Sequence, residues 1–294
     1  MRNAAIIAVA LGLAVVGCKR SRSNMIQNKG SDTLVNLAQY WAEEYKKVQP
    51  KISVAVSGGG SGTGIAALIN GTVDIANASR KIKDKERKAA KSKQGKEVVQ
   101  HIVAYDALAV YLNKANPNTR LTRKQLACIY GEKGTCNKWT DIGKEVPGCS
   151  GQTIVRVSRQ NNSGTYVYFR NWALQKKQDF KLGSRDMSGS KDVVDLVTKT
   201  PCAIGYSGLG YNTPKVATAC VTPTDDGKCA VPTIKGAVDG SYPIARALYM
   251  YTLGKPKGKI ADYIKWVQSA AGQKIVLKAG YAPVPASGSG KSGT

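Results

Sequence analysis

The chain has 294 residues, 42% of them hydrophobic, and its 44 Lys and Arg against 19 Asp and Glu give a formal net charge of +25. Length and apolar content together indicate a globular protein of two lobes and exclude a chain too polar to bury a core. The densest basic run, residues 80–96, has no aromatic residue and no recognised nucleic-acid-binding motif, which argues against nucleic acid as a partner. The scattered positive charge instead suits the attraction of small anions toward a cleft.

The N-terminal segment is predicted to be a signal peptide over residues 1–17, because Arg2 precedes an apolar run too short to span a bilayer. The sequence VVGC over 15–18 resembles a bacterial lipobox, in which the Cys is lipidated and begins the mature chain. The alternative is a plain signal peptide in which Cys18 is incidental. We therefore expect a membrane-anchored lipoprotein on the periplasmic or cell-surface side, with residues 18–24 as its lipidated tether.

The next part of the chain alternates strands with helices. Apolar patterning predicts strands over 25–29, 52–56 and 74–76 and helices over 34–48 and 65–69. This order implies an α/β fold with a mostly parallel sheet, in which ligands gather at the carboxyl ends of the strands. The apolar stretch over 98–113 is longer than one ordinary strand needs and is expected to carry the chain into a second lobe.

The first lobe is expected to comprise residues 25–106 and 243–285, and the second lobe residues 107–242. Further helices are predicted over 121–130, after Thr165, and over 191–199, 260–267 and 272–278, with strands over 153–157, 203–206 and 248–252. Residues 286–294 form a tail rich in Gly and Ser that is expected to be flexible.

Three short stretches rich in Gly, Ser, Thr and Asp each precede a predicted helix, at 30–33, 58–64 and 163–165. Helix N-termini carry unsatisfied N–H donors and a partial positive charge, so each stretch is a suitable seat for an oxyanion. Ordinary helix capping is the alternative for any one of them. Arg80 and Arg159 favour a shared anion, because guanidinium groups bind phosphate-like oxyanions through two parallel hydrogen bonds.

The six cysteines that follow Cys18 predict disulfides, since their number is even and an export signal precedes them. Cys220 is expected to pair with Cys229 across a turn containing Pro, Asp and Gly. The others are left to pair among themselves: Cys128, Cys136, Cys149 and Cys202. No Cys-x-x-Cys occurs and His101 is the single histidine, so neither a metal nor a cofactor is expected.

Several long motifs follow one another in the order found in a known family. They are GSDTLVNLAQYWAEEY, VSGGGSGTGIAALINGTVDIANASR, VSRQNNSGTYVYF, AIGYSGLGY, YPIARALYMYT and AGQKIV..AGY. In these motifs the chain resembles the phosphate-binding proteins of bacterial high-affinity phosphate ABC transporters. The resemblance implies a type II periplasmic-binding-protein fold, with two α/β lobes, a two-strand hinge and a cleft that closes on orthophosphate. It also implies a monomer that works with a permease and an ATPase.

The resemblance places the family's anion contacts on matching positions of this sequence. They are Ser31, Asp32, Thr33, Ser61, Ser79, Arg80, Arg159, Ser163, Gly164 and Thr165. Two positions depart from the family pattern: Arg80 stands where some members have an aspartate, and Gln160 and Asn161 stand where a carboxylate often follows the second arginine. Asp32 is then the one acid in the matched loops, and we expect it to accept the phosphate proton, with helix capping as the alternative. Arg159, without an acidic neighbour, is expected to offer its full charge to the ligand, while Arg80 either contacts the anion or pairs with an acid across the cleft.

Other function classes find less support in the sequence. An enzyme with Ser163 as nucleophile lacks an evident base, because His101 lies in an apolar stretch. A nucleotide-binding loop over 288–292 lacks the upstream glycine, since Pro285 takes its place. The remaining alternatives are a protein of the same fold that binds sulfate, molybdate or tungstate, and a basic surface lipoprotein for adhesion or sensing.

Overall fold

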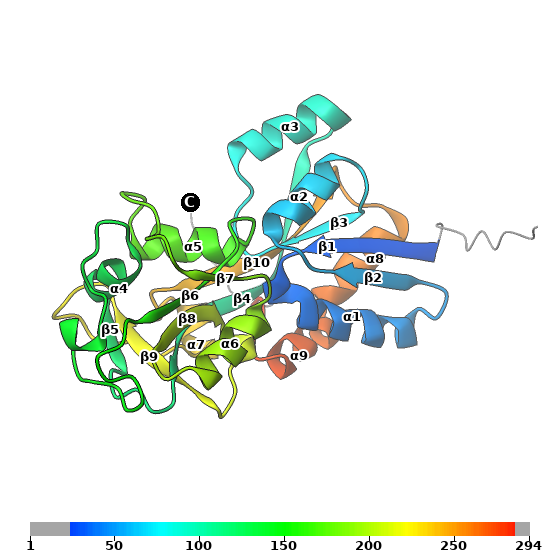
Figure 1. Ribbon diagram of the computed structural model, residues 1–294. Helices are drawn as coiled ribbons and strands as arrows, with labels where there is room; N and C mark the ends of the chain where they lie inside the picture. The colour runs from blue at the N-terminus through cyan, green and yellow to red at the C-terminus, as the bar shows by residue number, and fades with distance from the viewer. Residues whose placement is uncertain (1–23, 286–294) are drawn as a thin grey trace, which may run out of the picture.

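The computed structural model describes residues 24–285. The predicted signal peptide, the lipidation of Cys18, nearly all of the tether and the tail lie outside these residues. Over the described part of the chain, no helix combines the length and the apolar composition needed to cross a bilayer. A curled ten-stranded sheet runs through the molecule in the order β2-β1-β3-β10-β4-β8-β6-β7 (Figure 1). Outside this order, β9 pairs with β4, and β5 pairs with β9.

Lobe 1 contains one end of this sheet and five helices. Its strands are β1 (Met25–Gly30), β2 (Ser53–Ser57) and β3 (Ile75–Ala78), and its helices are α1 (Val35–Val48), α2 (Ser61–Ile69), α3 (Asp84–Gln94), α8 (Gly258–Val267) and α9 (Ala270–Lys278). The strand β1 pairs in parallel with both β2 and β3. Helices α1, α8 and α9 pack on one face of the sheet, and α2 and α3 cover the other (Figure 1).

Lobe 2 contains the other end of the sheet. Its strands are β5 (Arg120–Thr122), β6 (Val155–Arg159), β7 (Arg185–Met187), β8 (Ala203–Gly208) and β9 (Val216–Thr222), and its helices are α4 (Arg123–Tyr130), α5 (Gly164–Ala173), α6 (Ser190–Lys199) and α7 (Ile234–Asp239). The strand β6 lies in parallel between β7 and β8. Aromatic side chains fill the core beneath α4 and α5, where the rings of Phe169 and Tyr206 stack with their centroids 3.9 Å apart.

Two strands connect the lobes, as the predicted hinge requires. They are β4 (Val98–Asn113) and β10 (Ala245–Leu253), which pair in antiparallel fashion. The strand β4 pairs with β10 as far as Ala107 and with β8 from Leu108 onward, so it passes from one lobe into the other. The residue-level lobe boundaries stay a prediction, although this change of partner lies at the expected junction.

Local sequence patterns account for most of these elements. In α1 the apolar residues Leu37, Trp41 and Tyr45 recur at helical spacing, and all three are buried against the sheet. Asn70 ends α2 at the predicted Asn-Gly break. The sequence analysis missed β5, β7, β9 and α7, of which the first two have three residues each.

Three disulfides join the cysteines of lobe 2. Cys220 pairs with Cys229, which confirms the predicted pair. The other four cysteines pair among themselves, Cys128 with Cys136 and Cys149 with Cys202. The disulfide between Cys149 and Cys202 joins residues 53 positions apart. It links the loop before β6 to the residue just before β8, so it fixes that loop to the sheet.

Candidate functional site

Five hydroxyl side chains meet where the two lobes touch. In lobe 1, Ser31 Oγ donates to Ser79 Oγ at 2.9 Å, and Ser61 Oγ lies 3.3 Å from Ser79 Oγ. Across the lobes, the hydroxyls of Thr33 and Thr165 lie 2.9 Å apart. All five residues are at least 98% buried. We call these residues the hydroxyl cluster; they follow β1, begin α2, follow β3 and begin α5, so the predicted stretches do converge.

Gly164 allows the lobes to approach each other at this cluster. A Cβ added at Gly164 would lie 2.4 Å from Ser61 Oγ and 2.6 Å from Ser79 Oγ, closer than atoms can approach. The first turn of α5 therefore presents bare backbone to the lobe 1 hydroxyls. Ser163, the preceding residue, caps this helix, because its Oγ accepts from the amides of Thr165 at 3.1 Å and Tyr166 at 3.4 Å. The capping alternative thus holds for Ser163, whereas no side chain caps the helices after the first two stretches.

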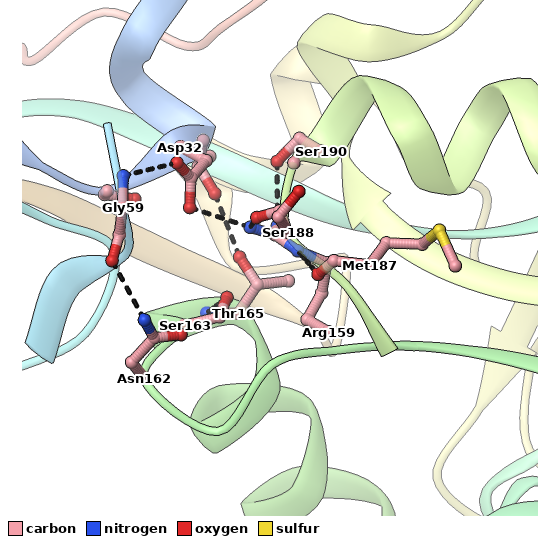
Figure 2. Close-up of polar contacts among 12 residues, drawn as sticks. Asp32, Gly59, Arg159, Asn162, Ser163, Thr165, Met187, Ser188 and Ser190 are labelled. Carbon is pink, nitrogen blue, oxygen red and sulfur yellow. Dashed lines mark hydrogen bonds and ion pairs between the residues drawn. The ribbon is translucent and has the colours of Figure 1, made fainter. Parts of the chain in front are cut away.

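Arg159 lies fully buried at the end of β6 and pairs with Asp32 of lobe 1 (Figure 2). Its Nη2 donates to Asp32 Oδ2 at 2.9 Å and to the Ser188 carbonyl at 2.7 Å, and its Nη1 donates to Ser190 Oγ at 2.9 Å. Burial lowers the pKa of Arg159, the Asp32 carboxylate opposes this shift, and the guanidinium stays charged. The expectation that Arg159 lacks an acidic partner is wrong, because the carboxylate comes from the opposite lobe.

The side chain of Asp32 contacts the glycine-rich stretch and Arg159, and it does not cap a helix. Its Oδ1 accepts from the backbone amide of Gly59 at 2.8 Å, while Oδ2 faces Arg159 (Figure 2). The carboxylate therefore bridges the first two predicted stretches and the second lobe. Each carboxylate oxygen has capacity for one further hydrogen bond, so Asp32 remains able to accept a proton from a ligand.

Asn162 joins the lobes beside this ion pair, and the sequence analysis did not identify it. Its carbonyl accepts from the amide of Gly62 at 2.9 Å, and its Nδ2 donates to the Gly59 carbonyl at 3.0 Å. Gly60 is close as well, since a Cβ there would lie 2.8 Å from the Asn162 carbonyl oxygen. The glycine-rich stretch over 58–64 thus serves as a contact between the lobes as well as a helix start.

Arg80 pairs with an acid of its own lobe. Its Nη1 and Nη2 bond to the two carboxylate oxygens of Glu86 at 2.8 and 2.6 Å, and Glu86 belongs to α3 of the same lobe. Burial raises the pKa of Glu86, but the bonds from Arg80 and from the Lys83 amide outweigh it, and the net shift is downward. The alternative of an acid across the cleft is wrong, because an acid six residues onward is nearer. Among the described residues the guanidinium of Arg80 bonds to no member of the hydroxyl cluster, and its Nε is buried without a partner.

A second buried ion pair supports the cluster from the hinge, and the sequence analysis missed it. Arg246 of β10 lies opposite Asp106 of β4, and its Nε and Nη2 donate to Asp106 Oδ2 at 3.1 and 2.8 Å. Its Nη2 also donates to Thr165 Oγ1 at 3.0 Å and lies 3.4 Å from Thr33 Oγ1. The only signal in the sequence was that each of two apolar runs contains a single charged residue. Charged residues are seldom buried in a core without a partner, so each of these charges indicated a buried partner.

Comparisons with known proteins agree with this arrangement. Residues 19–271 match the model of a PBP superfamily domain. The phosphate-binding protein PstS of Pseudomonas aeruginosa is 36% identical, over 90% of this chain and 84% of its own length, and the protein SphX of Synechococcus elongatus is 32% identical, over 97% and 86%. Among solved structures, a phosphate ABC transporter substrate-binding protein of Clostridium perfringens with bound phosphate has a TM-score of 0.77 at 27% identity, covering 89% of this chain and 100% of its own. The chain belongs to the PBP superfamily and, within it, to the family of phosphate-binding proteins represented by these relatives.

Proposed function

We propose that the protein captures inorganic phosphate between its lobes and delivers it to the permease of an ABC transporter. The observation that carries the proposal is the interlobe cluster of buried hydroxyls, flanked by two buried guanidinium groups, in a chain that belongs to this family. Hydroxyls and guanidiniums are donors, and the three unprotonated oxygens of a hydrogen phosphate dianion need donors. In the described structure the Ser163 hydroxyl bonds only to backbone amides, and no imidazole bonds to it, which favours binding over nucleophilic catalysis.

When the anion binds, its oxygens replace the hydrogen bonds that the hydroxyls of the cluster make to one another. Bonds between two neutral hydroxyls, such as Thr33 to Thr165, are replaced by shorter and stronger charge-assisted bonds to phosphate oxygens. The proposed contact residues are those named from the sequence: Ser31, Asp32, Thr33, Ser61, Ser79, Arg80, Arg159, Ser163, Gly164 and Thr165. For Arg80 the available donors are Nε and the second N–H of Nη2, since Nη1 bonds to both Glu86 and the Lys81 carbonyl.

Entry of the anion requires the lobes to separate, because the cluster is buried and its hydroxyls bond across the interface. Residues 25–106 with 243–285, and residues 107–242, are the two bodies that move about β4 and β10. The bound anion bridges both and stabilises the closed arrangement, which the permease recognises before the ATPase drives transport. The protein acts as a monomer held at the membrane by lipidated Cys18, outside the cytoplasm.

Calorimetry on the mature, anion-stripped protein tests this function. We expect heat of binding with phosphate and a much weaker response with sulfate, molybdate or tungstate. A thermal-shift panel of the same anions gives an independent reading, because a ligand at 100 times its Kd stabilises the folded state by about 2.7 kcal/mol. Preference for another oxyanion would reassign the ligand, and no response to any anion would favour adhesion or sensing.

Asp32→Asn is expected to reduce the preference for phosphate over sulfate. Phosphate keeps a proton at neutral pH and sulfate has none, so a carboxylate that accepts this proton would face another acceptor when sulfate is bound. Sites built around a substrate OH discriminate by about 10⁴ to 10⁵, and we expect the variant to lose at least about tenfold of its preference. Competition calorimetry with both anions measures it. Asp226→Asn, an exposed acid in lobe 2, is the control, and an unchanged preference in Asp32→Asn would show that another group accepts the proton.

A further inference from the structure

A second basic cavity adjoins the hydroxyl cluster. Its volume is about 490 Å³, and it lies between the loop that follows β3 in lobe 1 and helix α5 in lobe 2, with β10 as its floor. The cationic side chains that line it are Arg80, Lys81, Lys83, Lys176 and Arg246. No Asp or Glu is among its lining residues. A cavity with walls of one charge focuses the electric field and concentrates ions of the opposite charge.

The lysines of this cavity give it an unbalanced charge. Glu86 neutralises Arg80 and Asp106 neutralises Arg246, but in the described part of the chain Lys81, Lys83 and Lys176 have no carboxylate within 4 Å. All three are exposed, so they face solvent at the mouth. Partial burial and then the charge of Arg80 lower the pKa of Lys83, and the Glu86 carboxylate opposes this shift.

Arg80 lines the cavity and has a buried donor without a partner among the described residues. Arg80 is only 6% exposed, and this donor is its Nε. A buried donor left unpaired destabilises the folded state, and an anion oxygen that accepts from it would remove this cost. A Cβ on Gly62 would lie 3.8 Å from Arg80 Nη2, so the guanidinium lies beside the first turn of α2 and close to Ser61.

Arg246 connects the cavity to the hydroxyl cluster. It lines the cavity together with Tyr168, whose ring centroid lies 5.5 Å from the guanidinium carbon. The same guanidinium bonds to Thr165 and contacts Thr33. Lys176 reaches the cavity from a turn in which it and Gln175 have left-handed backbone (φ 59° and 52°), a conformation that costs non-glycine residues energy.

We propose that this cavity is an outer anion site, in which hydrogen phosphate binds weakly before separation of the lobes admits it past Arg80 and Arg246 to the hydroxyl cluster. The inference rests on the proposed function. It assigns Lys81, Lys83 and Lys176 to capture rather than to final affinity. Because the three lysines are exposed, added salt screens their attraction for phosphate. The Debye length is about 8 Å at an ionic strength of 0.15 M.

Stopped-flow mixing of the mature protein with inorganic phosphate, read by competition against a fluorescent phosphate reporter, tests the outer site. In the wild type we expect the observed rate to level off at high phosphate, because the outer site saturates. In Lys81→Gln/Lys83→Gln/Lys176→Gln the initial slope should fall about tenfold at low ionic strength and the difference should shrink in added salt. The control is Lys265→Gln/Lys274→Gln/Lys278→Gln on α8 and α9, which pack on the face of the lobe 1 sheet opposite α2 and α3. It removes the same charge from exposed positions and should keep the wild-type slope.

The outcomes separate the two proposals. If calorimetry shows that the wild type binds phosphate, but the cavity variant and the control have the same slope and the same saturation, the outer site is overturned and the proposed function stands. Equal losses in both triple variants would also overturn it, because net charge alone would then explain the rate. If the wild type binds no phosphate, the proposed function fails and the outer site fails with it.

Discussion

Arg159→Ala is expected to weaken phosphate binding by about tenfold to a hundredfold, the loss that follows from removing one charged hydrogen-bond partner. The guanidinium lies fully buried, and three carbonyl or hydroxyl oxygens and the Asp32 carboxylate hold it in place. Such a group is oriented before the ligand arrives, so little side-chain entropy is lost on binding. Calorimetric titration with phosphate measures the effect.

Two variants separate direct contact from an effect through Asp32. If Arg159 touches the anion, Arg159→Ala weakens binding in the Asp32→Asn background as well as in the wild type. If Arg159 only orients Asp32, the second substitution adds nothing to the first. Arg185→Ala removes an exposed arginine from the neighbouring strand β7 and should leave the Kd unchanged. A wild-type Kd in Arg159→Ala would remove this residue from the proposed site.

The sequence was sufficient for elements that carry their own pattern. Helix α1 shows helical spacing, the Asn-Gly pair ends α2, and β4 stands out as one long apolar run. The stretches before α2 and α5 were likewise recognisable, because glycine and hydroxyl residues precede apolar runs. The three-residue strands β5 and β7 have no such pattern, since their pairing depends on partners elsewhere in the chain.

The electrostatic partners at the site could not be predicted from the sequence. Asp32 and Arg159 are 127 residues apart, and Asp106 and Arg246 are 140 apart. Whether two such charges meet depends on how the lobes close and on the register of β4 against β10, which no local pattern encodes. By contrast, Glu86 lies six residues after Arg80, and the start of α3 places it within reach. That pair was recognisable in principle, but the sequence analysis considered the run over 80–96 only as a possible nucleic-acid interface.

Arg246→Met is expected to destabilise the folded protein by about 3–5 kcal/mol, because it leaves Asp106 as a buried charge without its partner. The pair is 2% and 0% exposed, so solvent screens it very little. The substitution also removes the donors to the Ser79 carbonyl and to Thr165. Chemical denaturation with guanidinium chloride measures the change as a lower midpoint at unchanged slope.

The double variant Asp106→Asn/Arg246→Met decides whether the isolated charge is the cause. Asparagine keeps a side-chain oxygen for the amide of Leu209, which Asp106 accepts at 3.1 Å, but it carries no charge. We therefore expect the double variant to recover most of the lost stability, since removing both members of a buried pair is far less costly than removing one. Lys235→Met, which breaks an exposed pair with Asp239 on α7, should leave the midpoint where it is. A double variant as unstable as Arg246→Met would assign the loss to the hydroxyl contacts of Arg246, and the hinge pair would then act mainly by holding Thr33 and Thr165 for the anion.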